Sequence, residues 1–120
     1  MKNVLIVDEN ECNRKLLALN LRVYYPNVNV INSSNGIEAE KMYVNNKDSI
    51  DMLLTEVRLP GQNGIELAQR VRQYNKNIPI GFITAQPKED IPKDFINSFY
   101  HRIPFDYDRL GVSLINYGKK

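Results

Sequence analysis

Asp51-Met-Leu-Leu-Thr-Glu56-Val-Arg-Leu-Pro60-Gly-Gln-Asn-Gly64 is the stretch that decides the fold of this chain. Its apolar run after Asp51 is too short for a typical helix and is followed closely by turn residues. Such a run is typical of a strand buried on both faces of a sheet. Glu56 follows the run, and Pro and Gly residues then indicate a turn before a helix. The stretch therefore predicts a buried parallel strand that delivers one carboxylate to its C-terminal edge, where open α/β sheets bind ligands.

The rest of the chain repeats this alternation of strand and helix. Apolar or alternating runs predict further strands over residues 4–7, 28–31, 78–83 and 99–103, each preceded or followed by a segment of helical spacing. Strict alternation is typical of a parallel sheet with helices on both faces. We therefore predict an α/β fold, a doubly wound five-stranded parallel sheet with strand order 2-1-3-4-5.

Three helices of this pattern carry more specific expectations. In the first, Leu16, Leu17 and Leu21 with Val23 and Tyr24 are expected to form the buried side. The fourth is interrupted by two prolines, so we expect it to be shortened or irregular, with at most one or two turns from Pro92 through Asn97. A last helix is predicted from Asp106 to Tyr117.

Composition indicates a small intracellular module. A length of 120 residues predicts one domain over residues 1–120, with no output domain attached. The formal charge of +2 is spread along the chain, which argues against nucleic acid as a partner. No apolar run approaches a signal peptide core or a membrane span, and a single cysteine, Cys12, fits a reducing compartment. We therefore expect a cytoplasmic protein that does not bind a membrane.

Three carboxylates follow strands that should be neighbours. Asp8 and Glu9 come after the first strand and Glu56 after the third. In the order 2-1-3-4-5 the carboxyl ends of these strands flank one crevice, so we expect the carboxylates to converge there. Oxygen ligands in such a cluster suit Mg²⁺. The sequence thus predicts an acidic site that is able to bind Mg²⁺ weakly.

Several motifs resemble the response-regulator receiver family across nearly the whole chain. The resemblance lies in the opening Val4 to Leu17 with its Asp8-Glu9 pair, in Asn35-Gly36, in the strand that ends at Thr84-Ala85, and in Pro104-Phe105. It implies a flavodoxin-like receiver fold in which Thr84 hydrogen-bonds a phosphoryl group. It also places Tyr100 at the family's switch aromatic, which turns inward when the domain is phosphorylated.

The sequence departs from this family at two positions that carry its chemistry. Glu56 stands at the phosphoacceptor position, where the family has Asp, and Ile103 stands where the family has Lys. An added methylene moves the acceptor oxygen by over an ångström, and a misplacement of that size can cost ~10²-fold in rate. Loss of the Lys removes a cation that neutralises transferring phosphoryl charge. Arg102 is adjacent, but strand alternation points it to the opposite face. Glu56 is able instead to hydrogen-bond Thr84.

Two functions remain open at this point, and two more are weaker. The first is a pseudo-receiver, a phosphorylation-independent signalling module that acts by protein–protein interaction, with a sensor kinase or a downstream signalling protein as partner. The alternative is a phosphorylatable receiver of a phosphorelay with a non-standard acceptor. A metal-dependent phosphatase lacks its second acid near Asp8, and a nucleotide binder lacks a glycine-rich loop after the first strand. We expect no enzymatic activity and no required cofactor.

Overall fold

The computed structural model describes residues 1–104 and 107–118, and it contains the predicted five-stranded parallel sheet. Along the chain the elements are β1 (Asn3–Val7), α1 (Glu11–Tyr24), β2 (Asn29–Ser33), α2 (Gly36–Asn45), β3 (Met52–Thr55), α3 (Gly64–Tyr74), β4 (Ile80–Thr84), the 3-10 helix η1 (Lys88–Asp90), β5 (Ser98–Arg102) and α4 (Tyr107–Gly118). The strand order is β2-β1-β3-β4-β5, with every pair parallel. The predicted order is therefore confirmed. Phe105 and Asp106 of the sequence expectations lie outside the described residues.

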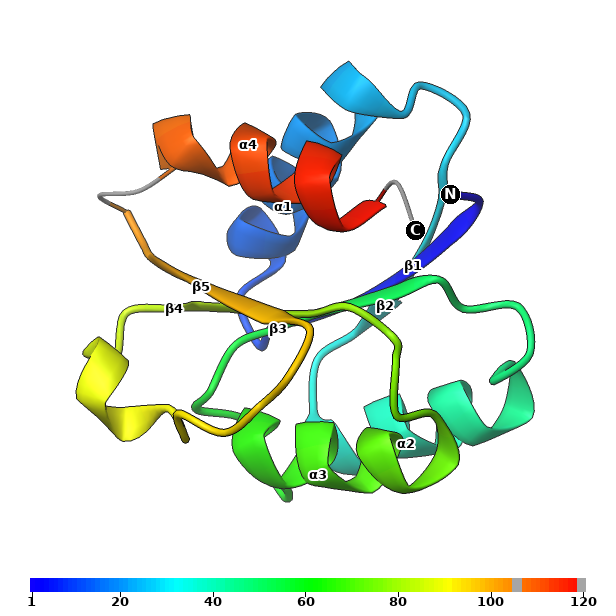
Figure 1. Cartoon of the computed structure of the whole chain (residues 1–120), viewed down its shortest axis with the longest axis vertical. Coiled ribbons are helices and arrows are strands. Elements are labelled where there is room, and N and C mark those ends of the chain that lie inside the picture. Colours follow the sequence, from blue (N-terminus) through cyan, green and yellow to red (C-terminus); the bar gives the residue numbers. More distant parts are fainter. Residues whose placement is uncertain (105–106, 119–120) are drawn as a thin grey trace.

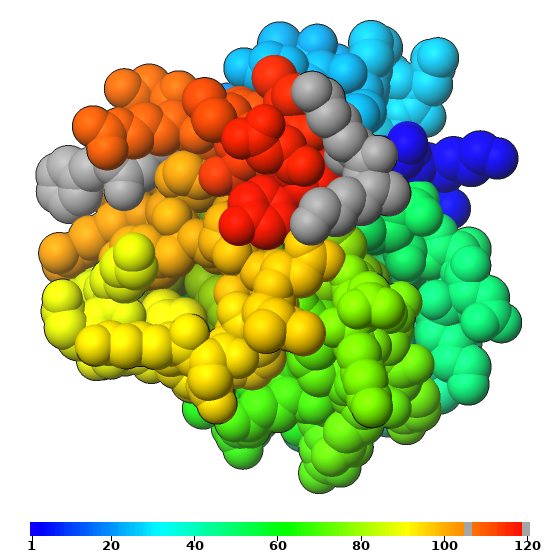
Figure 2. All heavy atoms as spheres, in the orientation of Figure 1, coloured from blue at the N-terminus to red at the C-terminus, as the bar shows by residue number. Residues whose placement is uncertain are grey.

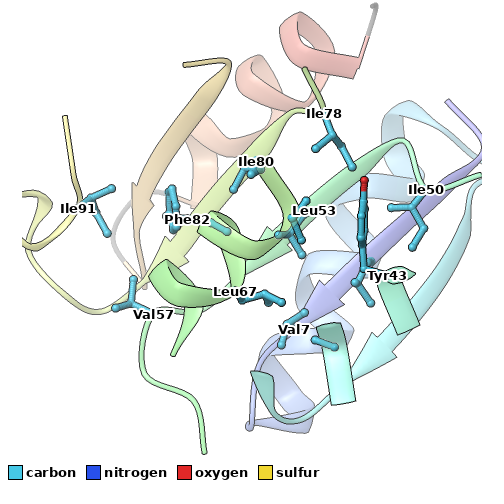
Figure 3. Close-up of a cluster of buried hydrophobic side chains, with 14 residues drawn as sticks. Val7, Tyr43, Ile50, Leu53, Val57, Leu67, Ile78, Ile80, Phe82 and Ile91 are labelled. Atoms are coloured by element: carbon cyan, nitrogen blue, oxygen red, sulfur yellow. The ribbon is translucent and has the colours of Figure 1, made fainter. Parts of the chain in front are cut away.

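Helices cover both faces of this sheet (Figure 1), with α2 and α3 on one face and α1 and α4 on the other. On the first face, Val7, Leu53 and Phe82 from three strands pack with Tyr43 of α2 and Leu67 of α3 (Figure 3). A second apolar cluster fills the space between the sheet and the helices α1 and α4. Since β1, β3 and β4 are buried on both faces, their runs are apolar throughout, which made them recognisable in the sequence.

Three helices begin at an asparagine that caps them. The side-chain oxygens of Asn10, Asn35 and Asn63 accept hydrogen bonds from the backbone N–H three residues later, at the starts of α1, α2 and α3. Each cap satisfies a backbone donor that has no partner inside the helix. These caps fix where each helix starts after the turn at the edge of the sheet.

The connection between β4 and β5 is where the helix prediction was wrong. No α-helix begins at Pro92; within the described residues the only helical segment of this connection is η1. Ile91 is extended, with φ −95° and ψ 128°, because the residue before a proline is disfavoured in the helical region. The more general prediction of an irregular fourth helix is confirmed.

The buried side of α1 also differs from its prediction. Leu16, Val23 and Tyr24 are 43%, 71% and 42% exposed, and the buried residues are Leu17, Ala18 and Leu21. Leu17 and Leu21 are four residues apart and share one face, while Leu16 and Val23 are rotated away from it.

None of the helices among the described residues combines the length and the apolar character that a membrane span needs.

Candidate functional site

The candidate site lies at the carboxyl edge of the sheet, where β1 and β3 run side by side. Val7 pairs with Thr55 in the register of these strands, so the next residues, Asp8 and Glu56, stand beside each other. Asp8 is 3% exposed and Glu56 is half-buried. The sequence prediction that these two carboxylates meet is therefore confirmed.

Helix α1 holds Asp8 in place. The backbone N–H of Asn10 donates to Oδ1 at 2.8 Å, and the Asn13 amide donates to Oδ2 at 3.2 Å. The Arg14 guanidinium donates to the Asp8 carbonyl oxygen at 2.6 Å. Burial raises the pKa of Asp8; the two hydrogen bonds and the charge of Arg14 oppose that rise, and the charge of Glu9 adds to it. The carboxylate is thus buried, and each of its two oxygens accepts a hydrogen bond from within the protein.

Glu56 is held by the turn after β3 and by the end of β4. The Val57 N–H donates to Oε1 at 2.6 Å, and the Thr84 side chain and the Arg58 backbone lie near enough to the carboxylate to favour its charged form. Burial raises the pKa of Glu56, and the charge of Asp8 raises it further against these hydrogen bonds. Thr84 thus lies beside Glu56, as the expected hydrogen bond between them requires.

A chain of hydrogen bonds leads from this carboxylate to the switch aromatic. The Gln86 N–H donates to the buried Thr84 hydroxyl at 3.0 Å. The Tyr100 hydroxyl donates to the Gln86 carbonyl oxygen at 2.5 Å. The Tyr100 ring is half-buried and packs against the apolar cluster on the α2 and α3 face. Glu56, Thr84, Gln86 and Tyr100 therefore form one connected unit.

The position before the cis Pro104 bond contributes no charge to the site. Ile103 is 6% exposed and its side chain belongs to the apolar cluster beneath α1 and α4. Its backbone N–H donates to the Thr84 carbonyl oxygen at 2.9 Å. Arg102, next to it, is exposed and donates from Nε to the Ala85 carbonyl oxygen. Ile103 is thus a packing residue in this structure.

Sequence reasoning missed Tyr107, at the start of α4. Its hydroxyl oxygen is buried and has no hydrogen-bond partner among the described residues. Burial raises the pKa of Tyr107, and the charges of Asp8 and Glu56 raise it further, so the hydroxyl lies within the electrostatic range of both carboxylates. The available signal was topological, because a residue that follows β5 emerges at the same edge of the sheet.

Glu9 does not join the acidic site, so the predicted convergence of three carboxylates was wrong. Its side chain is exposed, since the residue after Asp8 points the other way at the end of the strand. Among residues 1–104 and 107–118, no group of three His, Cys, Asp or Glu side chains is placed to hold a metal ion. Mg²⁺ requires near-ideal octahedral geometry, and three of the four oxygens of Asp8 and Glu56 already accept bonds. The residues present therefore do not fit a Mg²⁺ site as they stand.

Comparison with known proteins gives a consistent family. Residues 4–99 match the model of the response regulator receiver domain. The "Two-component response regulator-like PRR37" of Oryza sativa subsp. indica is 38% identical over 79 residues, which are 64% of this chain and 10% of that protein. The "Sensor histidine kinase RcsC" of Salmonella typhimurium is 34% identical over 82 residues, 68% of this chain and 8% of that protein. The chain thus spans about a tenth of the length of these relatives.

Solved structures share the fold over nearly the full chain. The structure described as the CheX-CheY-BeF3-Mg+2 complex from Borrelia burgdorferi matches with a TM-score of 0.83 and 26% identity, covering 99% of this chain and 90% of that one. The receiver domain of the hybrid histidine kinase CckA matches with a TM-score of 0.77 and 23% identity, covering 96% and 97%.

Proposed function

The chain belongs to the response-regulator receiver domain family of two-component signalling, and we propose that it acts there without phosphoryl transfer, as a protein-interaction module. We assign it no catalytic step. The observation that carries the proposal is the state of Glu56, which stands at the acceptor position implied by the family resemblance. Its Oε1 already accepts a hydrogen bond from the Val57 N–H, and the carboxylate lies beside Thr84, the residue that the resemblance reserves for a phosphoryl oxygen.

The charges around Glu56 support the same proposal. Stabilising the charge on a transferring group is usually a large part of catalysis, and it needs a cation or several donors aimed at that group. Ile103 supplies neither, because it packs in an apolar cluster. The pKa of Asp8 and that of Glu56 are both raised, mainly by burial, so their surroundings disfavour the charged forms of both carboxyls.

Packing, more than Glu56, holds the domain in one state in this proposal. Near-complete switching of a two-state equilibrium needs about 5.5 kcal/mol of differential interaction energy. One hydrogen bond from Thr84 to a carboxylate supplies only ~1.5–3 kcal/mol. Tyr100 adds to it, since its ring packs on the core and its hydroxyl is bonded to Gln86. We therefore propose an inward, active-like arrangement of Tyr100 that sequence and packing maintain.

The partner in this proposal is another signalling protein, either a sensor kinase or a downstream component. Two relatives support this choice by their descriptions: one is a sensor histidine kinase, and another is the CheY chain of a complex with CheX. The same proposal places the protein in the cytoplasm and gives it neither nucleic acid nor a membrane as a partner.

Intact-mass spectrometry after incubation with acetyl phosphate and Mg²⁺ tests the proposal. We expect the mass of this protein to stay unchanged, while a receiver that keeps the acceptor Asp and the Lys gains a phosphoryl group under the same conditions. A stoichiometric gain of one phosphoryl group by this protein would instead support the alternative, a phosphorylatable receiver with a non-standard acceptor.

A further inference from the structure

A pocket of about 400 Å³ opens between the η1 segment and β5. Its lining residues belong to β4, to β5 and to the connection between them, which forms no α-helix. Figure 2 shows the surface hollowed between the yellow segment around η1 and the orange β5 strand. The missing helix thus leaves a hollow that reaches Phe82, a core residue of β4. Ligand pockets in proteins are typically ~300–1,000 Å³, so this hollow is large enough for a small molecule.

The walls of the pocket are mainly aromatic and apolar. Phe82 and Phe95 meet edge to face with their ring centroids 5.5 Å apart, and Tyr100 and Ile91 complete the lining nearby. The two hydroxyl groups of the lining are bonded to the backbone: that of Tyr100 donates to the Gln86 carbonyl oxygen, and that of Ser98 donates to the Phe95 carbonyl oxygen at 2.7 Å. Water in such a pocket finds few partners, so an apolar ring gains by displacing it. A flat aromatic ring fits these walls, because aromatic pairs prefer edge-to-face or offset contacts.

The rim of the pocket favours a negative charge. Lys88 and Lys93 are exposed there, and neither belongs to the two ion pairs found among the described residues. Glu89 is the one acidic residue of the lining, so two cations face one anion. We propose that this pocket binds a small planar aromatic carboxylate, with its rings against Phe82, Phe95 and Tyr100 and its carboxylate between the two lysines.

Binding here would reach the acidic site through bonds already present. A ring in the pocket touches Tyr100, whose hydroxyl is bonded to Gln86, and Gln86 is bonded to Thr84 beside Glu56. The ligand therefore biases the same switch that phosphorylation biases in the family. This step rests on the proposed function, in which no phosphoryl group competes for that control.

The experiment is a titration of the full chain with 2-naphthoate, followed through its backbone amide resonances. We expect saturable shifts at Phe82, at residues 88–95 and 98–100, and onward at Thr84 and Gln86. Lys88→Gln with Lys93→Gln should weaken naphthoate about three- to tenfold, as the loss of two exposed ion pairs implies. The matched control is Lys2→Gln with Lys76→Gln, which removes the same charge elsewhere and should keep the native affinity.

Two further measurements separate the ring contacts from the charge. Neutral 2-naphthalenemethanol should bind the Lys88 and Lys93 double variant as well as it binds the native protein. Phe95→Leu keeps an apolar wall without the ring and should weaken both probes about fivefold. The inference would be overturned if the naphthoate shifts do not saturate, or if the two double lysine variants bind naphthoate equally well. The pocket would then be better explained as a binding site for a partner's side chain. If naphthoate binding fails in this way but the mass of the protein stays unchanged after incubation with acetyl phosphate, only this inference is overturned and the proposed function still stands.

Discussion

Removing a single hydroxyl should have opposite effects at two tyrosines of this domain. Tyr100 and Tyr107 are both half-buried, and each contributes its ring to an apolar cluster. The Tyr100 hydroxyl donates to Gln86 at 2.5 Å, whereas the Tyr107 hydroxyl is buried without a partner among the described residues, beside Asp8 and Glu56. Tyr100→Phe and Tyr107→Phe make the same chemical change in these two settings, so each serves as the control for the other.

The magnitudes follow from the two environments. A neutral hydrogen bond contributes about 0.5–1.5 kcal/mol net, so Tyr100→Phe should lower the free energy of unfolding by about 1 kcal/mol. A buried hydroxyl without a partner costs ~1–3 kcal/mol, so Tyr107→Phe should raise the free energy of unfolding by about 1 kcal/mol. The two variants should therefore differ by about 2 kcal/mol, which is about 1 M in urea midpoint for a protein of this size.

Urea denaturation followed by far-ultraviolet circular dichroism measures both values. The slope of the transition should be the same in the three proteins, because the surface exposed on unfolding does not change. A Tyr107→Phe variant less stable than the native protein would refute the reasoning. It would mean that the Tyr107 hydroxyl donates a hydrogen bond to one of the carboxylates and so stabilises the folded state.

Two other predictions concern the placement and the charge of Glu56. Gly64→Ala should destabilise the fold by about 2 kcal/mol or more, because its Cβ would lie 1.9 Å from the Glu56 carbonyl oxygen. The control, Gly118→Ala, should cost less, because its Cβ meets only the end of the Tyr25 side chain. Equal losses of stability in thermal denaturation would contradict this prediction. Burial raises the folded-state pKa of Asp8 and Glu56 above the ordinary values of 3.8 and 4.5, so the folded state binds more protons than the unfolded state just above those values. The contribution of this proton binding to the free energy of unfolding is complete when the pH is below the ordinary pKa values, and it is lost as the pH rises through the folded-state pKa values. In urea titrations across that range, Glu56→Gln should flatten this decline, and an unchanged slope would exclude the assignment.

The arrangement of the sheet could be predicted because burial leaves a direct mark on the sequence. Strands buried on both faces leave continuous apolar runs, such as residues 4–7 and 52–54, and each run is followed by a polar residue. The sheet order then places the residues after adjacent strands together. Asp8 and Glu56 were found in this way, Thr84 came from the family resemblance, and the structure brings all three to one edge.

The parts that could not be predicted depend on side-chain direction and on competition between local preferences. Glu9 lies two residues beyond the end of β1, and its side chain is exposed to solvent while that of Asp8 is buried. Pro92 suits the first turn of a helix, but it also forces Ile91 to be extended, and the latter effect dominates. Tyr107 reaches the acidic site through the docking of α4 on the sheet, which no local pattern encodes.

The most direct test of the central claim is whether a phosphoryl mimic changes the state of the switch. Amide resonances of Thr84, Gln86 and Tyr100 are recorded with and without beryllium trifluoride and Mg²⁺, at concentrations that saturate a receiver with an acceptor Asp. Because Glu56 already engages Thr84 and Tyr100 is already bonded to Gln86, all three resonances should stay where they are. A second set of resonances for these residues, growing to full occupancy with the mimic, would contradict the account.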